Sequence, residues 1–217
     1  MRENPKDRSE ERAARLAAAL AAAVDHRWPV VPGAVLTGGR CSCGDLDCTV
    51  PGAHPHDPSL LAATTDARMV RWWWERQSPD APVLAATGSS VSAVSLPAAA
   101  GARALVYLGA LRMPLGPVLA MPGRYALLVA PYSLDMLGEM LAQLPWVPGS
   151  LRYHGPGGFL ALRPAGRSAG CAGCWRRDRA WAAGSGCRRS GRCWASGGGD
   201  GPAGQRTLGV LIGGDRR

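Results

Sequence analysis

The chain has 217 residues, a hydrophobic fraction of 47 % and a formal net charge of +9. This length fits one domain with an appendage, and the apolar content excludes a chain that is disordered throughout. No apolar run approaches the ~20 residues that a membrane-spanning helix needs, so we expect a cytoplasmic protein without a membrane partner. The charge is uneven: residues 1–164 carry 15 basic and 13 acidic side chains, and residues 165–217 carry 10 arginines and 3 aspartates.

The last part of the chain differs in composition from the rest. Residues 165–217 hold 14 of the 29 glycines and 4 of the 7 cysteines, and few large apolar residues. Such a segment buries too little surface to offset its ordering entropy, so we predict a disordered tail, and a disordered N-terminus over residues 1–8. Lys6 is the only lysine beside 24 arginines, which indicates a high-GC bacterium. Two interpretations of the tail stay open: a selected basic segment, or the product of a shifted reading frame.

Helix and strand patterns are mixed along residues 9–164. Ser9 is the expected N-cap of a helix that runs to Arg27, and Thr65 or Asp66 is the expected N-cap of a second helix. Further helices are expected over 98–112 and 134–144. Short strands are expected at 83–86, 91–96, 117–120, 125–130, 151–153 and 159–162. The last two are predicted to form a hairpin. The mixture predicts one α+β domain over residues 9–164.

A loop between the first two helices has the spacing C-x-C-x4-C-x5-H. Three thiolates and one imidazole form a closed tetrahedral set of the kind that holds structural zinc. The predicted zinc ligands are Cys41, Cys43, Cys48 and His54. Two alternatives stay open: His56 is the fourth ligand, or the thiols are free. The tail cysteines 171, 174, 187 and 193 resemble a second site only superficially, because their flanks lack hairpin or helix patterning.

Three consecutive tryptophans, Trp72–Trp74, lie in the second predicted helix beside Arg71 and Arg76. One interpretation stacks nucleic-acid bases on them. Successive helical residues point about 100° apart, however, so we favour the helix core and its rim over a stacking platform. His154 precedes a glycine-rich turn and is interpreted as a surface or turn histidine.

Several of these segments together resemble the N-terminal domain of bifunctional DNA primase/polymerases, the prim-pol domain of the archaeo-eukaryotic primase superfamily. The similar stretches are Trp28–Pro32, the cysteine loop closing on Pro51–Pro55, Ala63–Trp74, Ala86–Gly88 and Gly157–Leu160. The resemblance covers about residues 12–164. It implies an RRM-like mixed or antiparallel sheet with flanking helices and a zinc-loop insertion. It also implies two divalent metal ions and template-directed nucleotide addition.

The family's catalytic positions are occupied by other residue types in this sequence. The resemblance implies a D-x-D pair at the end of the strand over residues 91–97, where this chain has Ser95 and Pro97. Ala126 occupies the position of a nucleotide-contacting histidine, and Arg152 that of a third acid. None of these side chains is a good magnesium ligand. We therefore expect no catalytic residues and a degenerate member of the family.

The leading hypothesis is a prim-pol-like domain that has lost polymerase activity and retains a surface for DNA or a nucleotide. Its candidate contacts are Arg124 and Arg152. An active primase/polymerase is the first alternative, with Asp135 and Glu139 recruited to hold Mg²⁺ or Mn²⁺. A regulator that binds an unknown protein partner through Trp72–Trp74 and the zinc loop is the second.

Overall fold

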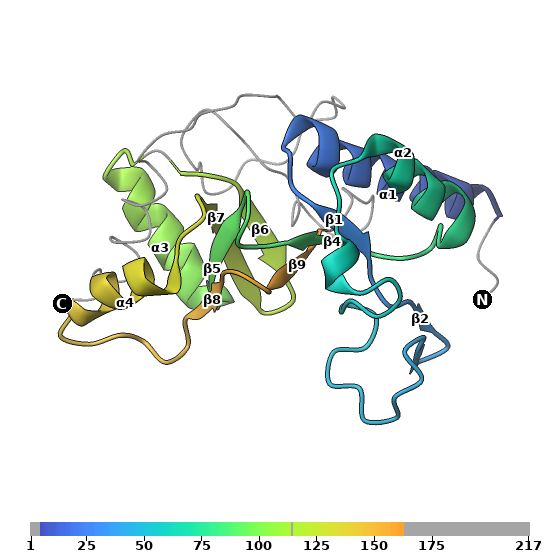
Figure 1. The fold of residues 1–217 in the computed structure, drawn as a ribbon. Helices are drawn as coiled ribbons and strands as arrows, with labels where there is room; N and C mark the ends of the chain where they lie inside the picture. Colours follow the sequence, from blue (N-terminus) through green and yellow to red (C-terminus); the bar gives the residue numbers. More distant parts are fainter. Residues whose placement is uncertain (1–4, 114, 163–217) are drawn as a thin grey trace. The chain divides into compact units, whose positions relative to one another are not determined.

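The computed structural model describes residues 5–113 and 115–162 (Figure 1). Within them the chain divides into two compact units, one formed by residues 5–87 with 157–162 and the other by residues 88–156. Each unit combines helices with an antiparallel sheet, so the α+β prediction is confirmed. Among the described residues, no helix is both long enough and apolar enough to cross a membrane.

The first unit is built on a three-stranded antiparallel sheet in the order β1-β4-β9. Val30 pairs with Ala85 across the first two strands, and Leu84 pairs with Ala161 across the last two. The strands are β1 (Val30–Pro32), β4 (Val83–Ala86) and β9 (Phe159–Leu162). The unit also contains the two-stranded hairpin of β2 (Leu36–Thr37) and β3 (Arg40–Cys41), and a short 3-10 turn over Leu60–Ala62.

Two helices of this unit, α1 (Pro5–Leu20) and α2 (Ala67–Trp72), lie side by side (Figure 1). Each continues into a single π-helical turn, Ala21–Asp25 after α1 and Trp73–Gln77 after α2. α1 begins at Pro5 and not after Ser9, so residues 5–8, which were expected to be disordered, form its first turn. Proline suits this position because the first helical N–H groups have no partner within the helix.

The N-cap of α2 is Asp66, whose carboxylate accepts a hydrogen bond from the N–H of Arg68 at 2.9 Å. The tryptophans that follow divide as the helical geometry predicts. Trp73 and Trp74 are buried, and Trp72 is 48 % exposed. The indole N–H of Trp74 donates to the carbonyl of Ala81 at 3.0 Å. The prediction of helix core and rim is confirmed, and these three side chains do not form one stacking platform.

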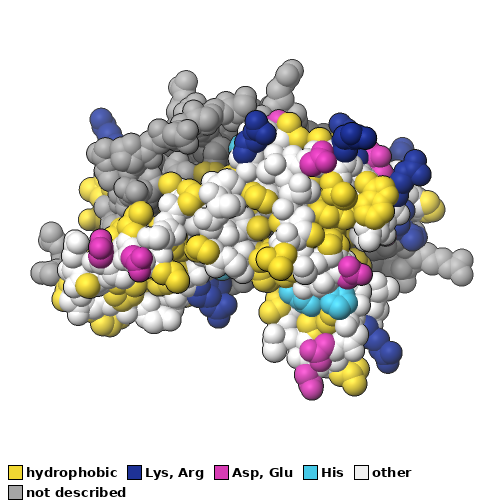
Figure 2. All heavy atoms as spheres, in the orientation of Figure 1, with side chains coloured by type: hydrophobic (Ala, Val, Ile, Leu, Met, Phe, Trp, Pro, Cys, Tyr) yellow, Lys and Arg dark blue, Asp and Glu magenta, His cyan; other side chains and the backbone are white. Residues whose placement is uncertain are grey.

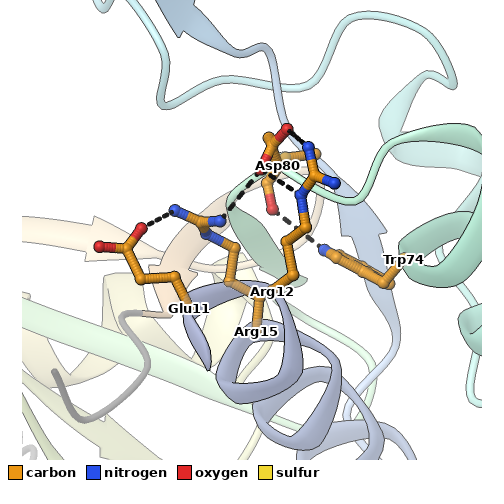
Figure 3. Close-up of polar contacts among 6 residues, drawn as sticks. Glu11, Arg12, Arg15, Trp74 and Asp80 are labelled. Carbon is orange, nitrogen blue, oxygen red and sulfur yellow. Dashed lines mark hydrogen bonds and ion pairs between the residues drawn. The ribbon is translucent and has the colours of Figure 1, made fainter. Parts of the chain in front are cut away.

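Polar contacts join α1 to the segment that precedes β4 (Figure 3). Arg12 Nε donates to Asp80 at 2.9 Å, and Arg15 lies between Asp80 and Glu11 at 3.4 and 3.0 Å. The hydrogen bond from Arg12 is the main reason why the pKa of Asp80 is lowered. Because Arg12 and Asp80 are both more than two-fifths exposed, solvent screening keeps the contribution of this pair to stability small.

The second unit has the element order β-α-β-β-α-β. Its strands are β5 (Ser92–Pro97), β6 (Val118–Met121), β7 (Arg124–Val129) and β8 (Arg152–His154), and its helices are α3 (Ala98–Ala110) and α4 (Leu134–Ala142). The sheet is antiparallel, in the order β6-β7-β5-β8. This connectivity is that of the ferredoxin-like and RRM-like folds, as the sequence resemblance implied.

Both helices of the second unit pack on the same face of its sheet. Val94 and Leu96 of β5 share one buried cluster with Leu105 and Leu108 of α3 and with Leu137 of α4. Neighbouring strand residues point to opposite faces, so Ser95, between Val94 and Leu96, faces away from these helices. The side chains on the other face of the sheet therefore take no part in packing against α3 and α4.

The predicted hairpin between the last two strands is wrong. β8 pairs with β5 in the second unit, and β9 pairs with β4 in the first. A short strand, a glycine-rich segment and another short strand resemble a hairpin in sequence, but alternation alone does not choose the partner of a strand. The partners of β9 and β8 are β4 and β5, which are themselves consecutive strands in the sequence.

Candidate functional site

The sheet of the second unit brings the sequence-predicted site positions onto one face. Ser95 at the centre of β5 lies opposite Ala126 on β7 and opposite Arg152 on β8. Pro97, two residues further on, lies opposite Arg124. Directly opposed residues of an antiparallel pair share a face, and so do residues i and i+2 of one strand. All five positions therefore lie on the face opposite α3 and α4.

Arg124 is held against Ser95 by several hydrogen bonds. Its Nε donates to Ser95 Oγ at 3.2 Å, and its Nη2 donates to the carbonyls of Ser95 and Ser150, both at 2.7 Å. These bonds join β7 to β5 and to the segment before β8. The guanidinium is thus fixed in place, because several of its N–H groups have backbone or hydroxyl acceptors.

His154 belongs to the same group, which the sequence did not indicate. Its Nε2 lies 3.0 Å from Ser95 Oγ, and it pairs with Ala93 on β5. The interpretation of this residue as a surface or turn histidine is therefore wrong. The one available signal was its position two residues after Arg152, since residues i and i+2 of a strand share a face.

The charge of this face is positive. Asp135 and Glu139 are the only carboxylate side chains between residues 88 and 156, and both are exposed on α4. Burial lowers the pKa of Arg124, and the positive charge of Arg152 lowers it further. Arg152 itself is exposed. The face therefore carries two guanidinium groups, an imidazole and a hydroxyl, and the carboxylates lie on a helix that packs on the other face.

The four predicted metal ligands lie together in the first unit. The ligand atoms of Cys41, Cys43, Cys48 and His54 all lie within 4.8 Å of one another. His54 Nε2 is 3.3 Å from the sulfurs of both Cys41 and Cys48. The loop that holds them extends from β1 toward Leu60, and Figure 2 shows histidine side chains at its base.

Backbone geometry positions two of these ligands. The hairpin of β2 and β3 ends at Cys41, and the N–H of Gly52 donates to its sulfur at 3.4 Å. Gly52 has a φ of +69°, and a Cβ there would lie 2.7 Å from the Cβ of Leu36, so glycine is required. His54 Nδ1 lies 2.8 Å from the carbonyl of Pro55. Donation of the Nδ1 proton to that carbonyl leaves the Nε2 lone pair directed at the thiols.

The ligands of this group differ in how readily they lose their protons. The N–H of Cys43, followed by that of Gly52, lowers the pKa of Cys41 to about 6, so its thiolate is populated near neutral pH. Burial is the main cause that raises the pKa of Cys48 to about 11. Hydrogen bonding to Pro55 and to Cys41 raises the pKa of His54. The Cys41 thiolate is thus already available, and a cation would have to displace the proton of Cys48.

The donor set fits zinc. For Zn–S of ~2.3 Å and Zn–N of ~2.0 Å, a tetrahedral ion needs sulfur-to-nitrogen distances of roughly 3.6 Å, close to the 3.3 Å found here. This Cys₃His group can therefore hold a metal ion such as zinc. His56 is not a member of the group, and its ring centroid lies 6.5 Å from that of His54.

The RRM-like unit and the Cys₃His loop place this chain in a class of α+β proteins with a candidate zinc site. Comparison with known families then identifies its family. Residues 19–185 match the family described as "Bifunctional DNA primase/polymerase, N-terminal". The match covers more than half of the chain, so the chain belongs to this family. No curated protein and no solved structure matched the chain.

The family match ends beyond the boundary expected from composition. It continues to residue 185, whereas the domain was predicted to end at residue 164. Residues 163–217, with the four tail cysteines, lie outside the described residues. The predicted tail and its two interpretations therefore stay predictions.

Proposed function

We propose that this chain is a primase/polymerase-family domain that binds DNA or a nucleotide without adding nucleotides. The observation that carries the proposal is the composition of the sheet face around Ser95. Phosphoryl transfer by two metal ions requires carboxylates that hold those ions beside the reacting phosphate. Ser95, Pro97 and Arg152 offer no carboxylate. Arg124 presents positively charged N–H donors at this place, where a metal ligand would have to present a lone pair.

The alternative of an active enzyme with recruited acids finds no support in the fold. Asp135 and Glu139 are the only candidates in residues 88–156. Both are exposed on α4, and Leu137 of the same helix packs with Val94 against the opposite face of the sheet. Carboxylates on that helix cannot reach a metal ion beside Ser95 without unpacking α4.

Retention of binding is supported by the charge and the fold. RRM-like sheets bind nucleic acids on the face opposite their helices. In this chain Ser95 and Ala126 at the centre of that face are buried, and Arg152 at its side is exposed. Arg124 and Arg152 lie on that face, and guanidinium groups suit phosphate because their donors match its oxygens. The third interpretation, a protein-binding surface on Trp72–Trp74, loses support because two of these three side chains are buried.

We further propose that the Cys₃His group holds zinc in a structural role. Four protein ligands fill a tetrahedral shell and leave no open position for a water or a substrate. The described part of the loop over residues 36–62 contains few regular elements, so a metal ion would supply order that its small core does not.

A primer-extension assay tests the proposed loss of activity. With a primed DNA template, deoxynucleotides and either Mg²⁺ or Mn²⁺, we expect no template-dependent product. The reason is that the described residues of the site include no carboxylate to hold either ion at the primer end. The same preparation should shift single-stranded DNA at low salt in a gel.

Primer extension and the gel shift test two separate parts of the proposal. A product whose sequence follows the template would contradict the loss of catalysis, whatever the gel shows. Absence of any shift, with either single- or double-stranded DNA and with a labelled nucleotide, would contradict retained binding. A known polymerase in parallel reactions controls for the template and the metal.

A further inference from the structure

The hydrogen bonds of Arg124 leave part of its guanidinium available. Nε is used by Ser95 Oγ, and Nη2 is used by the carbonyls of Ser95 and Ser150. Among the described residues, Nη1 has no acceptor. The two N–H groups of Nη1 belong to a guanidinium that is held in place by the carbonyls of Ser95 and Ser150. A ligand that accepts from Nη1 would therefore meet a donor that needs little further ordering.

Arg152 supplies a second cation on the same face. It lies opposite Ser95 on β8, is exposed, and forms no ion pair with a carboxylate of the described residues. Arg124 and Arg152 flank β5 from its two sides, and each charge disfavours the other. Two like charges held on one face without a carboxylate between them are stabilised by an anion.

The chemistry of the available donors identifies the anion. Two guanidinium groups offer several N–H donors in planar sets, which match the oxygens of a phosphoryl group better than those of a single-charge anion. The described residues of this face offer no carboxylate oxygen, which is the ligand that Mg²⁺ needs to join a phosphate to a protein. The positive charge that such an ion would bring is already present in the side chains.

We propose that Arg124 and Arg152 bind a phosphoryl group directly, without a divalent cation, and that Mg²⁺ competes with the protein for that group. A magnesium ion on the same oxygens removes negative charge from the ligand and adds a cation beside two guanidinium groups. Binding is therefore stronger without Mg²⁺. This inference rests on the proposed binding function and specifies its ligand and its metal dependence.

The test measures the affinity of the full, zinc-loaded chain for tripolyphosphate, dATP and an oligonucleotide without terminal phosphates. Isothermal titration is done with and without Mg²⁺ at matched ionic strength. Metal-free buffer is prepared with a resin and not with a chelator, because a chelator in solution would remove zinc. We expect the affinity for at least one probe to be roughly fivefold to tenfold lower in Mg²⁺.

Two variants assign the effect to this face. Arg152→Ala should lower the affinity without Mg²⁺ by roughly tenfold, because it removes one of two charged donors. Arg103→Ala is the matched control, since Arg103 is exposed on α3 on the other side of the sheet and alanine suits a helix. Equal affinities for these two variants would overturn the assignment to Arg152.

The remaining outcomes separate this inference from the proposed function. Binding that is equal or stronger in Mg²⁺ overturns the inference and leaves the binding function intact. No binding of any probe under either condition overturns both. Preference for dATP and tripolyphosphate assigns the site to a nucleotide polyphosphate, and preference for the oligonucleotide assigns it to a phosphodiester; both support direct phosphoryl binding.

Discussion

Replacing Cys41 with serine is expected to remove about one zinc ion per chain from the purified protein. The Cys41 sulfur lies 3.3 Å from His54 Nε2 and accepts the N–H of Gly52, so it has a central place in the group. A serine hydroxyl binds zinc poorly at neutral pH, and we expect the affinity to fall by more than about a hundredfold. Metal analysis gives the stoichiometry, and hydrogen exchange over residues 36–62 reports the order of the loop.

His56→Ala is the control for this substitution. His56 lies in the same loop but outside the Cys₃His group, and its loss should leave the zinc content unchanged. Both variants keep the four tail cysteines, so any zinc bound there cancels in the comparison. Equal zinc content in the two variants would show that Cys41 is not a ligand.

Truncating Trp74 to alanine is expected to destabilise the first unit by about 3–5 kcal/mol. Trp74 is 2 % exposed, and its indole N–H donates to the carbonyl of Ala81. The substitution leaves a cavity and an unpaired backbone acceptor, which together cost a large part of the ~5–15 kcal/mol that stabilises a typical domain. Urea unfolding followed by far-ultraviolet circular dichroism measures the change without relying on tryptophan fluorescence.

Trp72→Ala provides the comparison within the same helix. Its side chain is 48 % exposed, so the same chemical truncation should cost less than about 1 kcal/mol. Similar shifts of the urea midpoint in the two variants would contradict the division of these tryptophans into core and rim.

Local sequence signals predicted the elements of this fold well. The helix expected over residues 134–144 is present as α4, and Ser133 caps it by accepting the N–H of Met136. The strand pair β6 and β7 forms around Gly123, which has a φ of +69°. The C-x-C-x4-C-x5-H spacing predicted a group whose atoms the structure brings together. In each case the residues that interact are close in sequence.

Long-range pairing was not predictable in the same way. β8 and β9 are separated by a glycine-rich segment that is compatible with a hairpin, yet each pairs with a strand far away in sequence. The contact between His154 and Ser95 depends on that pairing, because a different register would place the imidazole on the other face. The sequence therefore predicted which positions belong to the site on the sheet. It did not predict the contacts among their side chains, which depend on how the strands pair.

The central claim is that the face around Ser95 no longer holds catalytic metal ions. Titration of the zinc-loaded chain with Mn²⁺, followed by the electron paramagnetic resonance of free Mn²⁺, tests it most directly. Because residues 88–156 carry carboxylates only on α4, we expect the free signal to rise in proportion to added Mn²⁺. Saturable loss of signal equivalent to one or two ions per chain, in the presence of a deoxynucleoside triphosphate and beyond what that nucleotide binds alone, would contradict the account.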